Sequence, residues 1–204
     1  AQLEGSKVFC KNVLRAADVP TADFQEFHSA EPAERFINER FSETPDDCPV
    51  VVKADGLASG KGVSVCFSKN EALKNSKEIL EGKFKSSNKL VLEEFLEGEE
   101  LSYFTIVDKN SYIFFGSAQD HKKVGEGEVG PNTGGMGAYS PSSILNTKLE
   151  KKIKNKIIEP TLKAMKKLGH PYRGFLYAGL MIKKGEPYLI EYNIRMGDPE
   201  CQVL

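Results

Sequence analysis

Apolar residues recur along this chain with two periods, one typical of helices and one typical of strands. Helical spacing covers residues 5–19, 29–41, 68–81 and 147–168. Short apolar or alternating runs, typical of strands, cover residues 22–27, 49–54, 62–67, 89–93, 100–108, 111–117, 174–184 and 188–195. The segment 119–143 is rich in glycine and has no period. We therefore expect an α+β fold.

The same pattern predicts three parts: an N-terminal helix over residues 1–20, a small α+β unit over 21–93 and a large one over 94–204. Ser68 and Glu71 have the spacing of a capping box at a helix start. Pro160 is expected to kink the helix 147–168. That helix carries eight lysines, which fit an anionic partner or a solvated helix face, and its apolar stripe favours the second interpretation.

The charge composition argues against some classes of partner. Among 204 residues, 28 are Lys or Arg and 29 are Asp or Glu, a net charge of −1, whereas binders of nucleic acid or anionic membranes need a basic surface. No apolar run is long enough to cross a bilayer, and residues 1–4 do not resemble a signal peptide. The cysteines Cys10, Cys48, Cys66 and Cys201 lack metal-site spacing and fit a reducing compartment. We expect a cytoplasmic monomer.

Two glycine-rich stretches imitate nucleotide-binding motifs. Residues 56–62 read GLASGKG, which has three residues between the first glycines instead of four and no Ser or Thr after the lysine, so this is not a Walker A loop. Residues 125–130 read GEGEVG and match G-x-G-x-x-G, but Pro131 follows where a helix should begin. Neither stretch predicts a P-loop or a dinucleotide fold.

Residues 50–62, VVVKADGLASGKG, are the first stretch that carries chemistry. Lys53 lies in an apolar strand, and a glycine-rich turn with a second lysine, Lys61, follows it. A buried lysine is costly unless an anion pairs with it. The stretch therefore predicts a flap that covers a polyphosphate; the alternative is a tight hairpin with Lys53 at an exposed edge.

Residues 90–100, LVLEEFLEGEE, join the two predicted units. A segment in this position can bind an adenine through its backbone N–H and C=O groups. Glu100, one turn further on, can accept hydrogen bonds from ribose hydroxyls. The alternative is an acidic surface loop, because five glutamates fall within eight residues.

Residues 187–195 read PYLIEYNIR. Strand alternation places three polar residues on one face, Glu191, Asn193 and Arg195, and four others on the opposite face, Tyr188, Ile190, Tyr192 and Ile194. Glu191 and Asn193 offer the oxygen ligands that Mg²⁺ prefers, and Arg195 is a fixed cation for a charged transition state. The alternative is a solvent-facing sheet edge.

These stretches, in this order, resemble the ATP-grasp superfamily. The segments VVVKADGLASGKGV, EEFLEGEELS, QDHKKVGEGEVGPNTGGMGAYSP, GFLYAGLMI and IEYNIRMGDPE are similar to those of the phosphoribosylamine–glycine ligase family, over nearly the whole chain. The resemblance implies two α+β subdomains that clasp ATP between them. Family members carry a further domain on each side of this region. The absence of an initiator Met and the abrupt end at Leu204 fit a central portion without those domains.

The resemblance also implies roles for single residues. ATP would be bound by Lys7, Lys53, Gly60, Lys61, Gly62, Glu94, Phe95, Leu96 and Glu100. Mg²⁺ or Mn²⁺ would be held by Glu191 and Asn193, and the catalytic residues would be Arg195, Lys61 and Asp198. The substrate side would comprise Asp120, His121, Gly134, Gly135, Met136, Gly137 and Asp198. Many ATP-grasp enzymes place another metal carboxylate near the position of Gly179, so the number of metal ions stays open.

The implied activity joins glycine to 5-phosphoribosylamine. The glycine carboxylate would attack the γ-phosphate of ATP, and the amine would then attack the resulting glycyl phosphate, giving glycinamide ribonucleotide, ADP and phosphate. Such a site must position and neutralise phosphates and exclude water from the acyl phosphate. His121 is a base for the amine or, as we favour, a structural histidine. Two alternatives remain: a nucleotide-binding module that is inactive without flanking domains, and another ATP-grasp carboxylate–amine ligase.

Overall fold

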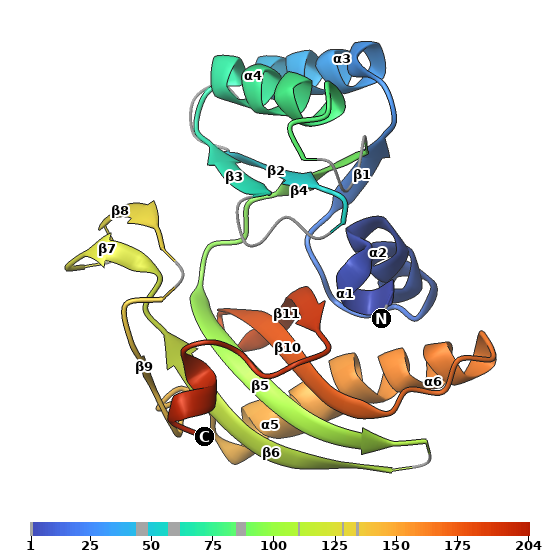
Figure 1. The fold of residues 1–204 in the computed structure, drawn as a ribbon, viewed down its shortest axis with the longest axis vertical. Helices are drawn as coiled ribbons and strands as arrows, with labels where there is room; N and C mark the ends of the chain where they lie inside the picture. Colours follow the sequence, from blue (N-terminus) through green and yellow to red (C-terminus); the bar gives the residue numbers. More distant parts are fainter. Residues whose placement is uncertain are drawn as a thin grey trace. The chain divides into compact units, whose positions relative to one another are not determined.

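A computed structural model describes residues 2–43, 49–56, 62–84, 89–109, 111–127, 129–133 and 135–204 (Figure 1). Their contacts divide the chain into two compact units. The N-terminal unit comprises Gln2–Lys11 and Ala22–Leu96, and the C-terminal unit comprises Asn12–Thr21 and Glu97–Leu204. The division therefore falls three residues after the expected boundary, and both units share the first 20 residues.

The N-terminal unit is a four-stranded antiparallel sheet in the order β1-β4-β2-β3. Its elements are α1 (Gln2–Gly5), the first part of α2 (Lys7–Ala16), β1 (Phe24–Phe27), α3 (Ala30–Glu43), β2 (Val50–Ala54), β3 (Val63–Cys66), α4 (Lys69–Leu80) and β4 (Leu90–Glu94). In place of the single helix expected over 5–19, α1 and α2 are separate. Ser6 lies between them, and its Oγ accepts a hydrogen bond from the Phe9 N–H (3.1 Å), capping α2.

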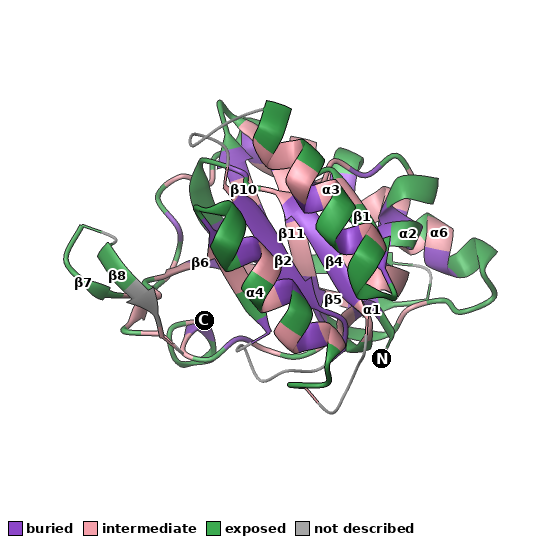
Figure 2. Cartoon of the chain, turned by 90° about the horizontal axis from the view of Figure 1, so that it is seen from above, coloured by how far each residue is buried: buried purple, intermediate pink, exposed green. Residues whose placement is uncertain are grey.

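Strand alternation gives the two faces of this sheet different roles. One face packs against α3 and α4 (Figures 1 and 2) and forms the core. The buried residues of this core are Phe27, Ala33, Ile37, Val50, Val52, Ala54, Cys66, Ala72, Ile79, Leu90 and Leu92. Lys53 and Glu93, one residue out of phase with these strand positions, therefore lie on the opposite face.

The start of α4 follows the predicted capping pattern with one change. Ser68 Oγ accepts a hydrogen bond from the Glu71 N–H (3.3 Å), as in a capping box. The Glu71 side chain accepts from the N–H of Phe67 (3.0 Å) and not from that of Ser68. The predicted helix is confirmed, and the reciprocal bond is shifted by one residue.

The C-terminal unit is built on a five-stranded antiparallel sheet in the order β11-β10-β5-β6-β9. Its elements are β5 (Glu99–Asp108), β6 (Ser111–Asp120), β7 (Lys123–Gly125), β8 (Val129–Asn132), β9 (Ala138–Tyr139), α5 (Thr147–Ile153), the π-helix η1 (Lys154–Ile158), α6 (Glu159–Lys167), β10 (Gly174–Lys183), β11 (Glu186–Asn193) and the 3₁₀-helix η2 (Glu200–Gln202). The segment 119–143, in which we expected no period, holds three of these short strands. Its G-x-G-x-x-G stretch lies in the β7–β8 hairpin, so its rejection as a dinucleotide motif is confirmed.

The long helix of this unit covers one face of the sheet (Figure 1) and changes its winding before Pro160. Pro160 has no N–H to donate to the preceding turn, and the five residues Lys154–Ile158 form a π-helix. The Tyr192 hydroxyl of β11 donates to the Ile157 carbonyl of this segment (3.4 Å) and to Thr161 Oγ1 of α6 (3.0 Å). Four of the eight lysines of the long helix pair with acids of the chain itself, for example Lys156 with Glu186 (2.8 Å). None of the helices in the described part of the chain is long and apolar enough to cross a membrane.

A bulge changes the predicted faces of β11. Gly179 pairs with Glu191 and Leu180 with Leu189, so Ile190 is an extra residue between them. The alternation predicted for residues 188–195 is therefore interrupted at Ile190, and the prediction is wrong for Tyr188, which lies on the face of Glu191 and Asn193 and not opposite them. The face toward the long helix contains Leu189 and Tyr192, and the other face contains Tyr188, Glu191 and Asn193. The prediction that Glu191 and Asn193 share a face survives the correction.

Gly98 gives the fold a sharp test, because it precedes β5 where the backbone passes close to β10. A Cβ at this position would lie 2.4 Å from the Ile182 carbonyl oxygen. We expect Gly98→Ala to destabilise the chain by about 1–3 kcal/mol through overpacking. Gly5→Ala is the matched control, because nothing lies within 4 Å of a Cβ there. Urea unfolding of both variants measures the difference, and equal midpoints would contradict the described approach.

Candidate functional site

Three charges meet on the sheet face of the N-terminal unit that lies opposite α3 and α4. The Nζ of Lys53 is 2.9 Å from Glu93 Oε2, and the Nζ of Lys11 is 3.1 Å from the same oxygen. The three side chains are only 3–6% exposed. Lys53 is therefore buried in a central strand, and its alternative placement at an exposed edge is wrong. The anion that compensates its burial here is Glu93.

Lys11 was not predicted as a site residue. Its ammonium group also donates to the Ala22 carbonyl (3.4 Å) and lies 5.4 Å from the centre of the Phe24 ring. Burial lowers the pKa of Lys11, and the negative charge of Glu93 opposes this effect. The sequence did contain one signal for Lys11. It lies four residues after Lys7, and this helical spacing places both lysines on one side of α2.

Asp55, directly after β2, fixes the start of α2. Its Oδ1 accepts from the Val8 N–H (3.1 Å) and from the Ser6 hydroxyl (3.1 Å). The Nζ of Lys7 donates to the carbonyl of Gly56 (3.2 Å). The first predicted phosphate lysine is thus held beside the residue that begins the glycine-rich turn.

The glycine-rich turn itself is described only at its ends. Gly60 and Lys61 lie outside the described residues. Gly62 is buried, and its carbonyl accepts from the Ala54 N–H (2.7 Å). Strand β3 follows at once and pairs antiparallel with β2. No helix follows the lysine, so the rejection of a Walker A loop is confirmed.

The predicted adenine segment lies at the end of the N-terminal unit. Glu94 ends β4 and is half-buried, and its N–H donates to the Asp23 carbonyl (2.9 Å). Phe95 is exposed by 38% and Leu96 is buried. Glu100 belongs to β5 of the C-terminal unit.

Strand register gathers the polar residues of the C-terminal unit on one face of its sheet. Directly paired residues of neighbouring strands point to the same side. The residues collected on this face, opposite the long helix, include Glu100, Ser102, Asp120, Tyr177, Gly179, Glu191 and Asn193. A Cβ on Gly179 would lie 3.6 Å from Glu191 Cγ. Gly179 therefore lies beside Glu191 without a side chain of its own. Many ATP-grasp enzymes, as noted above, place a further metal carboxylate near this position.

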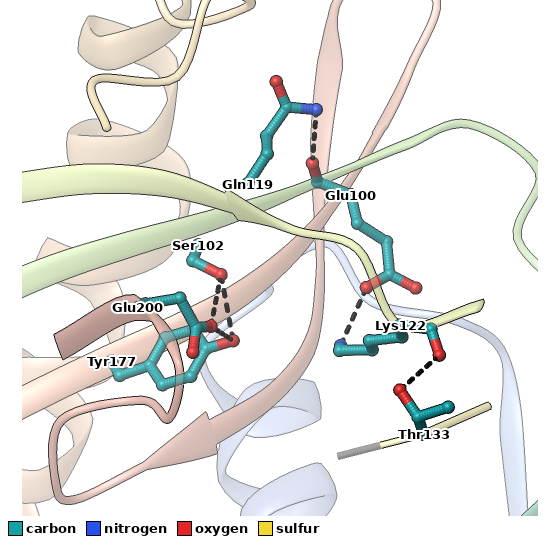
Figure 3. A network of polar contacts seen from close by, with 7 residues as sticks. All are labelled: Glu100, Ser102, Gln119, Lys122, Thr133, Tyr177 and Glu200. Carbon is teal, nitrogen blue, oxygen red and sulfur yellow. Dashed lines mark hydrogen bonds and ion pairs between the residues drawn. The ribbon is translucent and has the colours of Figure 1, made fainter. Parts of the chain in front are cut away.

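Glu200 is a buried carboxylate for which no role was predicted (Figure 3). Glu200 is only 2% exposed. Its Oε1 accepts hydrogen bonds from Ser102 Oγ (3.0 Å) and from the Tyr177 hydroxyl (2.9 Å). These bonds attach the segment after β11 to the sheet. Glu200 falls within the quoted segment IEYNIRMGDPE, but the strand period ends before it.

Lys122 and Thr133 organise the glycine-rich segment after β6 (Figure 3). The Nζ of Lys122 is 2.8 Å from Glu100 Oε2. Thr133 donates to the Lys122 carbonyl through both its N–H (2.7 Å) and its hydroxyl (2.9 Å), and its Oγ1 accepts from the Gly135 N–H (3.1 Å). Gly135 has φ +121°, and a Cβ would lie 2.4 Å from Cδ of Pro199, so glycine is required there.

The other predicted substrate residues differ in their surroundings. Asp120 has a buried Oδ1 with no hydrogen-bond partner among the described residues. Burial, reinforced by the charge of Glu200, raises its pKa to about 6. His121 is exposed, and its N–H donates to the Gly137 carbonyl (2.9 Å). Met136 is also exposed, and Gly134 lies outside the described residues.

Arg195 and Asp198 both lie at the surface beyond the end of β11. The Arg195 guanidinium donates to Asn193 Oδ1 (3.5 Å) and to the Met196 carbonyl (3.1 Å). Asp198 accepts from the Gln202 side chain (2.9 Å). The structure thus brings Arg195 to Asn193, one of the two predicted metal residues. In the described part of the chain, no three His, Cys, Asp or Glu side chains converge as a metal-binding group.

Comparison with solved structures defines the class of protein. The chain matches a biotin carboxylase domain of the Hydrogenobacter thermophilus 2-oxoglutarate carboxylase, solved with MgADP, with a TM-score of 0.71 at 23% identity over 98% of this chain and 42% of that one. It matches the Thermotoga maritima phosphoribosylamine–glycine ligase with a TM-score of 0.86 at 38% identity, over 98% of this chain and 50% of that one. The expected ATP-grasp α+β fold is confirmed.

Sequence comparison narrows the class to one family. The phosphoribosylglycinamide synthetase ATP-grasp (A) domain matches residues 5–201. The phosphoribosylamine–glycine ligase of Rhodopirellula baltica is 50% identical over 206 residues, which cover 100% of this chain and 47% of that protein. The chain belongs to this ligase family, as predicted, and spans about half the length of the curated relatives it matches.

The raised pKa of Asp120 predicts a pH dependence of stability. Its pKa is about 6 in the folded chain and 3.8 without the fold. Between these values the folded state binds more protons, so this residue makes stability fall as pH rises from about 4 to 6. We expect Asp120→Asn to raise the melting temperature above pH 6 and to lose this advantage near pH 4.

Asp108→Asn is the control for this measurement, because Asp108 is an exposed aspartate at the end of β5. Thermal melts of both variants and the parent chain between pH 4 and 8 give the comparison. A pH-independent effect of Asp120→Asn would exclude the proposed proton uptake.

Proposed function

We propose that this chain is the ATP-binding part of a ligase that joins glycine to 5-phosphoribosylamine through glycyl phosphate, releasing ADP and phosphate. The observation that carries the proposal is the family match over residues 5–201 together with Glu191 and Asn193 on one sheet face. The relatives that match the whole chain are named for this ligase. The proposed activity is that of the full-length ligases, because this chain spans only about half the length of these relatives.

In the N-terminal unit, Lys7 and Lys53 would meet the phosphates of ATP, with Gly60, Lys61 and Gly62 as the closing loop. Two observations support this. Lys7 is held beside Gly56 at the start of that loop, and the ammonium groups of Lys53 and Lys11 both pair with Glu93 Oε2. Ammonium groups attract an anion.

The adenine would be bound by residues 94–96, beside a further acceptor. Glu93 Oε1 is buried and has no hydrogen-bond partner among the described residues. A buried acceptor without a partner is costly, and an N–H donor of a ligand would satisfy it. Glu100 would take the ribose hydroxyls, with Lys122 fixing the orientation of its carboxylate.

Glu191 and Asn193 fit a bound Mg²⁺ or Mn²⁺ by the chemistry of their donors. A carboxylate and an amide oxygen are hard ligands, and Mg²⁺ usually completes its shell with phosphate oxygens and water. Gly179, which pairs with Glu191, adds no side chain of its own beside that carboxylate. When bound, the metal would neutralise charge on the phosphates. Arg195, held to Asn193, would steady the transferring phosphoryl group.

The substrates would lie toward the segment after β6. Asp120 carries an acceptor without a partner among the described residues, which suits a substrate amine. The loop of Gly134, Gly135, Met136 and Gly137, the neighbouring His121, and Asp198 would shape this side. Asp198, Arg195 and Lys61 would be the residues nearest the chemistry. The free cysteines Cys10, Cys66 and Cys201 support a cytoplasmic location, because free thiols fit a reducing compartment, and we propose that the protein is a monomer.

The metal assignment is tested by replacing both of its residues. We expect Mg²⁺ to lower the dissociation constant for ATP of the parent chain by roughly tenfold or more. The variant Glu191→Ala/Asn193→Ala should not show this effect of Mg²⁺. Isothermal titration with and without Mg²⁺ measures it. Glu186→Gln, a charge change at the other end of β11, should keep the effect. An unchanged Mg²⁺ response in the double variant would refute the assignment.

An activity assay of this chain by itself distinguishes a ligase from a nucleotide-binding module that is inactive without flanking domains. Turnover with glycine and 5-phosphoribosylamine would exclude the module hypothesis, whereas ATP binding without turnover would support it. A panel of other carboxylates and amines distinguishes a different ATP-grasp ligase.

A further inference from the structure

Glu200 is a side chain to which the proposed function gives no role. Its Oε1 accepts hydrogen bonds from the hydroxyls of Ser102 on β5 and Tyr177 on β10 (Figure 3). All three residues are buried. A carboxylate accepts stronger hydrogen bonds than a neutral oxygen does, and burial strengthens them further. The segment after β11 is therefore attached firmly to two strands of the sheet.

The two hydroxyls lie in the same rows of the sheet as the predicted metal residues. Tyr177 pairs directly with Asn193 across β10 and β11. Ser102 belongs to the neighbouring row, which crosses β10 and ends at Glu191. Residues of one row point to the same side of the sheet. The attachment of Glu200 is thus made in the two rows that carry these predicted ligands.

The loop after β11 rests on the Glu200 carboxylate. A Cβ on Gly197 would overlap this carboxylate, so the loop backbone lies directly against it. The Cys201 N–H donates to the Gly197 carbonyl (2.9 Å) and fixes the same turn. Arg195 lies two residues before Gly197 and donates to Asn193 Oδ1 (3.5 Å). The backbone from which the guanidinium extends therefore has its place set by Glu200.

We propose that Glu200 is a positioning residue for Arg195: it fixes the loop after β11 to the sheet and so keeps the guanidinium at Asn193, ready for the γ-phosphate of ATP. The inference rests on the proposed function, in which Arg195 steadies the transferring phosphoryl group. Glu200 acts through the loop backbone and need not touch the nucleotide. Such placement matters because a shift of about 1 Å can remove most of the effect of a group on a reacting centre.

A comparison of ATP with ADP isolates the contact with the γ-phosphate. Dissociation constants of both nucleotides, with Mg²⁺ present, are measured by titration calorimetry on the parent chain and on Glu200→Ala. We expect ATP to bind roughly tenfold more weakly to the variant, whereas the constant for ADP changes by less than about twofold, because ADP lacks the phosphate that Arg195 meets. Glu186→Ala, which removes a carboxylate from the other end of β11, should change neither constant.

A double-mutant cycle shows whether the two residues act together. Arg195→Ala should weaken ATP binding by roughly tenfold, and Glu200→Ala added to it should weaken ATP binding by less than about threefold more, because the group that Glu200 positions is then absent. Additive losses overturn the inference. So does a Glu200→Ala variant in which ATP and ADP change by the same factor or not at all.

Failure of the proposed function gives a different result. An Arg195→Ala variant that keeps the parent's preference for ATP over ADP, or a parent chain that binds no ATP, would refute the proposed function itself. A preference that depends on Arg195 but not on Glu200 would refute the positioning role alone.

Two conservative variants cover the case in which Glu200→Ala does not fold. Tyr177→Phe keeps the ring against Phe104, 4.6 Å between ring centres, and removes one bond to Glu200. It should weaken ATP relative to ADP by roughly fivefold, the effect of about one hydrogen bond. Glu200→Gln keeps an acceptor oxygen and should hold the ratio within about twofold of the parent value. A folded Tyr177→Phe with the parent ratio, or Glu200→Gln as weak as Arg195→Ala, contradicts the positioning role.

Discussion

The need to compensate buried charge governs both units of this chain. In the N-terminal unit, Lys53 lies in a central strand, and Glu93 on the neighbouring strand makes its burial possible. In the C-terminal unit, Glu200 lies on the polar face of the sheet and is satisfied by a serine and a tyrosine hydroxyl. Each charge is placed on the sheet face that the long helices do not cover. The polar faces carry the residues to which we assign ligand binding.

Much of the fold follows from the sequence because helices and strands bury one face with a regular period. The buried run 50–54 and the helix starting at Ser68 were predicted because apolar period and capping chemistry agree there. The strands over 100–108 and 111–117 and the strand ending in Glu191 and Asn193 were predicted from their apolar or alternating runs. Glu191 and Asn193 share a face because they lie two residues apart on one strand, after the bulge at Ile190.

The remaining features depend on contacts between residues distant in sequence. The bulge at Ile190 arises from the register between β10 and β11, which no local period encodes. The short strands of segment 119–143 contain glycine and proline, which carry little pattern. Lys11 and Glu200 have no distinguishing pattern in the sequence. Only the structure shows that Lys11 pairs with Glu93 and that Glu200 accepts hydrogen bonds from Ser102 and Tyr177. Lys7, Lys53, Glu191 and Asn193 were recognisable because polar residues interrupt apolar strands or resemble the family's motifs.

The attachment of Glu200 to the sheet has an entropic consequence. Arg195 and Asp198 lie on a loop with its far end held by two buried hydrogen bonds and its near end continuous with β11. A loop restrained at both ends has already lost much of its conformational freedom when the chain folds. A ligand that meets these side chains therefore needs to order little more of the backbone, and a larger share of the contact energy is left for affinity.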